Sequence, residues 1–149
     1  MPRRRRRVLA SGVFDLIHYG HLRFLEEAKR AGGRSAELVV VVARDSTVRR
    51  LKGRDPILPE EERRAIVEGL KPVDRAFLGY EELQITQVIE VYKPDIIALG
   101  YDQEEIAEKV RVAVKEGGYN AEVVIIPKFG KGDFNSSSKI KRRIAENLR

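Results

Sequence analysis

The chain has 149 residues, no cysteine and a formal net charge of +6. A chain of this length fits one domain with a single core, and the lack of cysteine excludes disulfides, thiolate metal sites and cysteine nucleophiles. The longest apolar run, residues 38–43, is far shorter than the roughly 18 residues that a membrane-spanning helix requires. No apolar signal segment follows the basic N-terminus, so we expect a cytoplasmic protein. Charged residues make up 35% of the chain, which points to a thermophile.

The positive charge is concentrated at the N-terminus, where Arg3 to Arg7 form an uninterrupted block. No aromatic residue is interleaved with these arginines, so a solvated tail is favoured over an arm that binds nucleic acid. We therefore expect a basic tail over residues 1–7 and one folded domain over residues 8–149. Deleting residues 2–6 should then change neither the activity nor the melting temperature.

Apolar runs rich in β-branched residues alternate with helical patterns along the rest of the chain. Strands are expected at residues 8–13, 38–44, 75–78, 96–99 and 122–126, and helices at residues 18–31, 59–70, 83–92, 103–116 and 136–147. Residues 45–58 are expected to form a polar loop. Continuous apolar strands separated by helices predict an α/β fold with a parallel sheet covered on both faces. In the last helix Ile140, Ile144 and Leu148 recur at every fourth position, which predicts an apolar stripe on the core.

The segment after the first strand, from Gly12 to His21, contains both histidines of the chain. Their spacing of three residues puts His18 and His21 on one face of the first helical turn. Free backbone N–H groups and the helix dipole attract an anion to that turn, and Gly20 leaves room for it. A single histidine is more often a core residue, and Asp15 alone would be a turn or cap residue. The pair at a helix start directly after a strand favours a phosphate site.

This segment resembles the signature of the cytidylyltransferase-like nucleotidyltransferases, in which a Gly-x-Phe-Asp turn leads into His-x-Gly-His. The resemblance covers nearly the whole chain after residue 7. It implies a single Rossmann-like, doubly wound parallel sheet of about five strands in the order 3-2-1-4-5. Short archaeal FAD synthases of this superfamily carry the Gly-Tyr-Asp-Gln turn found at residues 100–103. Similarity to them implies a homodimer that transfers AMP from ATP to FMN, giving FAD and pyrophosphate, with no nucleic-acid or membrane partner.

The resemblance also assigns site residues. Residues 135–140 resemble the family's Ile-Ser-Thr-Thr-Lys-Ile segment, which holds phosphates at a helix start, and residues 52–54 resemble its basic loop. The implied catalytic residues are His18, His21 and Lys52, and the implied acceptor-binding residues are Lys52, Arg54 and Phe129. The implied nucleotide-binding residues are Val13, Phe14, His18, Tyr19, Gly20, His21, Asp102, Lys131, Ser136, Ser137 and Ser138. From the residues alone, residues 52–54 could be an ordinary surface loop, and Asp102 and the serines could be helix caps.

The expected mechanism is direct attack, because no serine–histidine–acid relay is available and the acceptor phosphate is already ionised. Anionic neighbours would favour the charged form of the histidines. Mg²⁺ would be carried on the nucleotide phosphates, with no metal-binding residue assigned. Arg63 is expected to be structural and to pair across its helix. An apolar slot for a flavin ring could be formed by the side chains of Pro56, Ile57, Leu58, Phe129 and Phe134, which are otherwise core or lid residues.

Two other functions remain open at this point. One is a cytidylyltransferase that acts on a phosphorylated alcohol such as glycerol phosphate, and the other is a nucleotide-binding module without turnover. Asn135 and Lys131 depart from the residues usual in cytidylyltransferases, and a lysine lacks the bidentate fork of an arginine. These departures argue against glycerol phosphate as the acceptor.

Overall fold

A five-stranded parallel sheet forms the centre of the molecule. The computed structural model describes residues 5–81, 84–129 and 137–148. The strands are β1 (Arg7–Gly12), β2 (Glu37–Val42), β3 (Arg75–Leu78), β4 (Ile96–Gly100) and β5 (Glu122–Ile126), and all their pairings are parallel. Their order in the sheet is β3-β2-β1-β4-β5. The α/β class and the strand order predicted from the sequence are thus confirmed.

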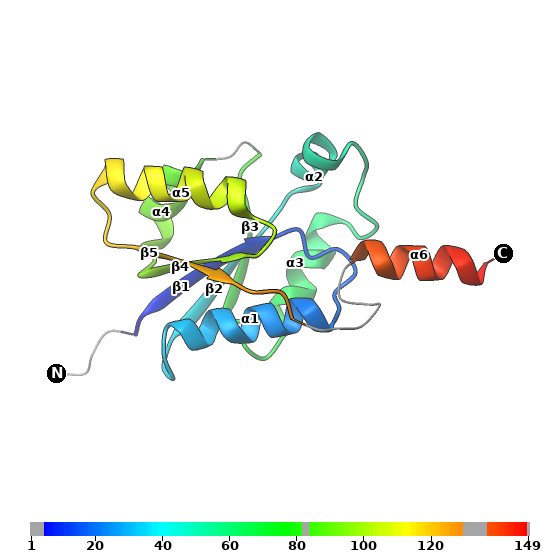
Figure 1. The fold of residues 1–149 in the computed structure, drawn as a ribbon, viewed down its shortest axis with the longest axis horizontal. Helices are drawn as coiled ribbons and strands as arrows, with labels where there is room; N and C mark the ends of the chain where they lie inside the picture. The colour runs from blue at the N-terminus through cyan, green and yellow to red at the C-terminus, as the bar shows by residue number, and fades with distance from the viewer. Residues whose placement is uncertain (1–4, 82–83, 130–136, 149) are drawn as a thin grey trace.

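Two apolar cores lie on opposite faces of this sheet. One face is covered by α1 (Tyr19–Ala31) and α3 (Glu60–Glu68), and the other by α4 (Ile85–Tyr92) and α5 (Glu104–Gly117) (Figure 1). Because successive strand residues point to opposite faces, Ala98 of β4 belongs to the first core, and Ile97 and Leu99 belong to the second. The chain leaves β1 toward β2 on one side and returns to β4 on the other. A crevice is therefore expected at the carboxyl ends of β1 and β4.

The helix α2 (Asp45–Lys52) lies where a polar loop was expected, so that prediction was wrong. The helix buries one side chain, Val48, and such a short element shows little apolar periodicity in the sequence. Asp45 in its first turn and basic residues in its last turn complement the helix dipole. Gly53, with a φ of 69°, ends the helix in the left-handed conformation that glycine adopts most readily.

Residues 5–7 are attached to the domain and do not form a solvated tail. The guanidinium of Arg5 donates to the carbonyl oxygens of Ser35 (2.7 Å) and Ala36 (3.1 Å), and the Arg6 carbonyl accepts from the Glu37 N–H (2.8 Å). Arg7 already belongs to β1. Deleting residues 2–6 would therefore remove these contacts of the folded state, and its effect on activity and melting temperature stays a prediction.

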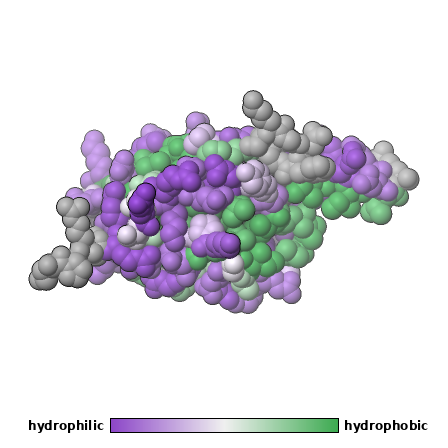
Figure 2. All heavy atoms as spheres, turned by 90° about the horizontal axis from the view of Figure 1, so that it is seen from below, coloured by the Kyte–Doolittle hydropathy of each residue, from purple (hydrophilic) through white to green (hydrophobic). Residues whose placement is uncertain are grey.

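The helix α6 (Ser137–Asn147) extends away from the sheet (Figure 1). Ile144 is 49% exposed and Leu148, just after the helix, is 82% exposed, so the predicted packing of this apolar stripe on the core is wrong. A period of four residues identifies an apolar side of a helix but not the surface that covers it. Figure 2 shows an apolar area that continues from the body of the molecule along α6.

Within the described ranges no helix combines the length and the apolarity needed to span a bilayer.

Candidate active site

A cavity of about 630 Å³ opens at the carboxyl end of the sheet, where the strand order reverses. Many residues predicted for the site line it: Gly12, Val13, Phe14, His18, Gly20, His21, Lys52, Arg54, Asp102, Phe129 and Ser138. Tyr19 is not among the lining residues, and its side chain is 64% exposed. Lys131, Phe134, Asn135 and Ser136 lie outside the described residues, and only the backbone of Ser137 is described. The structure thus brings together residues from both predicted phosphate sites and from the basic loop.

The turn between β1 and α1 is held in a strained conformation. Phe14 and Leu16 have φ values of 55° and 51°, in the left-handed region that costs a non-glycine residue about 1–3 kcal/mol. A side chain at Gly12 would meet the ring of Phe14 at 2.8 Å, which explains the need for glycine there. These two strained residues flank Asp15 and turn it into the protein interior, where it is buried.

Asp15 ties the turn to two other segments of the site. Its carboxylate accepts hydrogen bonds from the backbone N–H groups of Ile57 (2.9 Å) and Leu58 (3.0 Å) and lies 3.3 Å from Lys141 Nζ of α6. Burial by itself raises the pKa of Asp15, but the two amide hydrogen bonds and Lys141 outweigh it and hold the pKa below its usual value. Asp15 therefore remains a carboxylate that fixes the loop after α2, and it does not cap α1.

The two histidines share one hydrogen-bond arrangement at the start of α1. His18 Nδ1 accepts from the Gly20 N–H (3.0 Å), and His21 Nδ1 accepts from the His18 N–H (3.2 Å). Their ring centroids are 3.9 Å apart. A neutral imidazole that accepts at Nδ1 carries its proton on Nε2. Each ring therefore offers an Nε2–H donor, and both rings line the cavity.

Both imidazoles are neutral at pH 7 in the free protein. Burial, together with the nearby charges of His18 and Lys52, lowers the pKa of His21 to about 4, and Asp15 opposes these effects. Burial also lowers the pKa of His18. The charged form expected from the sequence therefore does not apply to the protein without bound phosphates. Lys52, at the end of α2, lies close enough to act electrostatically on His21.

Arg63 is structural, as expected, but it does not pair across its helix. Its side chain is fully buried and donates to the carbonyl oxygens of Leu58 (2.9 Å), Val13 (2.8 Å) and Ala43 (2.7 Å). It also donates to Asp45 Oδ1 at 2.7 Å. Arg63 thus joins the segments that follow β1 and β2 to the start of α2 and so holds the backbone of the site.

The turn after β4 presents Tyr101 and Asp102 at the cavity. Gln103 is the N-cap residue of α5, and no side chain makes a capping hydrogen bond to that helix. The exposed Asp102 is therefore not the helix cap that its position in the sequence permitted. Tyr101 was not predicted for the site. The Nζ atom of Lys128 lies 5.4 Å from the centroid of its ring, so an aromatic side chain and a cation flank this turn.

Of the described residues predicted for an apolar slot, Phe129 lines the cavity and the other three do not. Pro56, Ile57 and Leu58 do not line the cavity, and Phe129 lies on the α1 side, with the Arg23 guanidinium carbon 5.1 Å from its ring centroid. The apolar lining comes from other residues, chiefly Leu51, Ile85, Val88, Ile89, Leu99 and Ile106. Sequence reasoning missed them because the strand and helix patterns assign all of these residues except Leu51 to the core, and Leu51 falls in the segment expected to be a polar loop.

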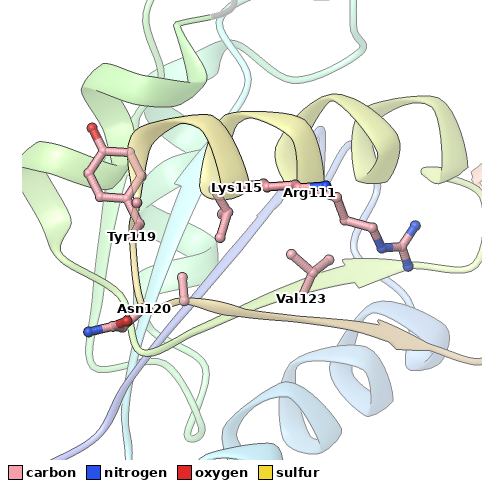
Figure 3. A pocket seen from close by; sticks show the side chains of 8 residues that line it. Arg111, Lys115, Tyr119, Asn120 and Val123 are labelled. Atoms are coloured by element: carbon pink, nitrogen blue, oxygen red, sulfur yellow. The ribbon is translucent and has the colours of Figure 1, made fainter.

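A second depression lies between α5 and β5 (Figure 3). Arg111, Lys115, Tyr119, Asn120 and Val123 are among its lining residues, and none of the predicted site residues belongs to it. The hydroxyl of Tyr119 donates to Glu90 at 2.7 Å, so this aromatic side chain joins α4 to the segment after α5.

Within the described part of the chain no group of three or more histidine, aspartate or glutamate residues could hold a metal ion.

Comparison with known proteins agrees with this geometry. The model of the family described as cytidylyltransferase-like matches residues 9–143. The chain belongs to the cytidylyltransferase-like family. An FAD synthase of Methanopyrus kandleri is 49% identical over 95% of this chain and 93% of its own length. An FAD synthase of Aciduliprofundum boonei is 46% identical, with 95% and 92% covered.

Solved structures show the same fold. The lipopolysaccharide core biosynthesis protein of Thermoplasma volcanium is 43% identical, with a TM-score of 0.71 over 84% of this chain and 98% of that chain. Two structures of pantothenate synthetase of Thermus thermophilus are 20% identical, with TM-scores of 0.58 and 0.59 over 89% of this chain and 59% of each of those chains. The second likeness concerns the fold alone.

Proposed function

We propose that this chain is an FMN adenylyltransferase, which transfers AMP from ATP to FMN and releases FAD and pyrophosphate. FAD synthases that align with more than nine-tenths of the chain support the proposal. The structural observation that carries it is the pair of imidazoles at the start of α1, whose Nδ1 atoms are occupied by backbone N–H groups. Two oriented Nε2–H donors beside a helix N-terminus suit a phosphate on which charge develops.

The reaction is a direct in-line displacement. An oxygen of the FMN phosphate forms a bond to the α-phosphorus, and the bond from that phosphorus to the oxygen bridging to the β-phosphate breaks. The electron pair leaves with pyrophosphate. No general base is required, because the attacking phosphate oxygen is already ionised. His21 donates to the α-phosphate, His18 to the bridging and β-phosphate oxygens, and Lys52 offsets the developing charge. Bound phosphates would raise the pKa of both histidines from the low values of the free protein.

The remaining site residues hold the two substrates. Lys52 and Arg54 hold the acceptor phosphate, Asp102 borders the nucleotide, and Tyr19 and Gly20 border its phosphates at the start of α1. The other nucleotide contacts proposed are Val13, Phe14, Lys131, Ser136, Ser137 and Ser138. Mg²⁺ is carried by the triphosphate oxygens. No protein ligand is assigned to it, because Asp15 is occupied by two amides and Lys141, and a single carboxylate such as Asp102 is a sparse donor set.

The proposal is tested with purified protein, Mg²⁺ and matched substrates. ATP and CTP are each incubated with FMN, riboflavin or glycerol phosphate, and the products are separated by chromatography. We expect FAD from ATP and FMN, no product from riboflavin, which lacks the attacking phosphate, and little product from CTP and glycerol phosphate. CDP-glycerol in place of FAD would show a cytidylyltransferase. Nucleotide binding without pyrophosphate release would show a binding module.

We further infer that two copies of the chain associate through α6. The family resemblance implies a homodimer, and the exposure of Ile144 and Leu148 supports it. The apolar area in Figure 2 that continues along α6 gives a second copy a surface to cover. Single exposed apolar residues are common on monomers, whereas a stripe on a projecting helix is not.

A further inference from the structure

The apolar part of the cavity lies on the α4–α5 side of the sheet, and nothing above assigns it a ligand. We propose that it binds the flavin ring of the acceptor. The flavin slot, as we call it, consists of Leu51, Ile85, Val88, Leu99 and Ile106, all of which line the cavity. This inference rests on FMN as the acceptor, and it names the surface that selects a flavin over a small phosphorylated alcohol.

The floor and walls of the flavin slot come from three elements. Leu99, at the end of β4, is buried and forms part of the second core. Ile85 and Val88 are three residues apart on α4, and Ile106 is in the first turn of α5, so all three lie on the ends of their helices nearest the cavity. These three side chains are half-buried. A flat apolar ligand between the two helices would complete their burial.

Leu51 gives the slot an apolar rim. Its side chain is 67% exposed although it lines the cavity, which leaves apolar surface in contact with water. The helix that carries it is held beside the segment after β3, because Arg50 Nη1 and Thr47 Oγ1 both donate to the Glu81 carbonyl, at 2.9 and 3.4 Å. A ligand that covers Leu51 removes this apolar surface from water, which favours binding.

The slot lies next to Lys52, and for this reason we assign it to the flavin ring of the acceptor and not to the adenine ring of ATP. Lys52 follows Leu51 directly in the chain, and Lys52 and Arg54 are the residues proposed to hold the acceptor phosphate. The ring attached to that phosphate therefore extends along α2 into the slot, whereas the triphosphate of ATP lies toward α1 and α6. Thr47, Arg50 and Gln84 also line the cavity near this rim. Their polar groups match the carbonyl and N–H edge of a flavin, and the apolar floor matches its dimethylbenzene edge.

Two substitutions test the slot, each against a control on the same part of the chain. Val88→Phe fills the slot, and Val91→Phe makes the same change on the same helix at an exposed position that does not line the cavity. Leu51→Ser removes the rim at a position so exposed that folding should be unaffected. Phe129→Leu tests the alternative ring site on the α1 side. Steady-state kinetics with ATP and FMN, flavin fluorescence titration and inhibition by riboflavin are measured for each, together with melting temperature.

We expect Val88→Phe to raise the KM for FMN about tenfold or more, and Leu51→Ser to raise it about fivefold or more, with the KM for ATP within about twofold. Riboflavin, which carries the ring without the phosphate, should inhibit the wild type in competition with FMN and inhibit both variants less. Val91→Phe should leave the KM for FMN unchanged, and Phe129→Leu should raise it less than Leu51→Ser does. An increase of the KM for ATP instead, or an increase of the FMN value in Phe129→Leu alone, would overturn the slot. Should Val88→Phe not fold, Leu51→Ser decides by itself. A wild type that makes no FAD would instead contradict the proposed function.

Discussion

At the scale of single residues, His21 offers the sharpest test, because its two ring nitrogens have different tasks. Nδ1 accepts from the His18 N–H, and Nε2 is the donor proposed for the α-phosphate. The amide group of an asparagine can take the place of Nδ1 but does not reach the position of Nε2. The amide group of a glutamine reaches the position of Nε2. We expect His21→Asn to lower kcat about 10²-fold or more while ATP affinity stays within about tenfold, and His21→Gln to retain more activity. Turnover and calorimetric ATP binding check this.

Equal losses in the two variants would mean that His21 is needed only for packing. A rise in KM with kcat preserved would mean that it contributes to ground-state binding and has no role specific to the transition state.

The low pKa of His21 also predicts how stability depends on pH. The pKa is about 4 in the folded protein, against 6.5 when unfolded, so the unfolded chain binds more protons between these values. The free energy of unfolding should therefore fall as the pH is lowered from 7 to 5, by about 2 kcal/mol from His21. His18, whose pKa is also lowered, acts in the same direction.

Urea unfolding at pH 7 and pH 5 measures this loss, and His21→Asn serves as the control. The carboxylates with lowered pKa, such as Asp15 and Asp74, lose their contribution only below this window. If the free energy of unfolding falls by the same amount from pH 7 to pH 5 in the wild type and in His21→Asn, His21 is not held neutral by burial.

At the scale of elements, Arg63 holds α2 and α3 to the ends of β1 and β2. Replacing it with methionine leaves three partly buried carbonyl groups without this donor and removes the Arg63 partner of Asp45. We expect Arg63→Met to lower the free energy of unfolding by about 3 kcal/mol or more, measured by urea denaturation. Arg64→Met is the matched control, because Arg64 makes salt bridges within the same helix, to Glu61 and Glu68, and should change stability much less. Similar losses in both variants would contradict the anchoring role.

At the scale of the whole molecule, the apolar side of α6 predicts the oligomeric state. We expect the protein to elute as a dimer in size-exclusion chromatography with light scattering. Ile144→Glu together with Leu148→Glu should shift it to a monomer, because charged side chains would have to be buried without partners. Val112→Glu is the control, at an exposed position on α5. A dimer that persists in the double variant would mean that the dimer contact lies outside this side of α6. A monomeric wild type would contradict the proposed dimer.

The sequence by itself determined the features that depend on neighbours along the chain. The alternation of apolar strands and helices determined the α/β class, and the turn from Gly12 to His21 identified the family and the two imidazoles. The spacing of His18 and His21 predicts that they lie close together, and in the structure they do so as the N-cap and N3 residues of a capping box at the start of α1. The tertiary contacts of Arg63, in contrast, join residues 13, 43, 45 and 58, which no local pattern relates to one another.

Only the tertiary structure decided how surfaces are covered and which protonation states the site adopts. The spacing of Ile140, Ile144 and Leu148 is the same whether the stripe packs on the core or remains exposed, and the direction in which α6 leaves the body decides between the two. Likewise, the apolar residues of α4 and α5 show the same periodicity in the sequence whether they pack in the core or line a cavity. The neutral form of His21 follows from burial and from the charges of His18 and Lys52. Burial and the approach of Lys52 arise only when distant segments of the chain meet in the fold.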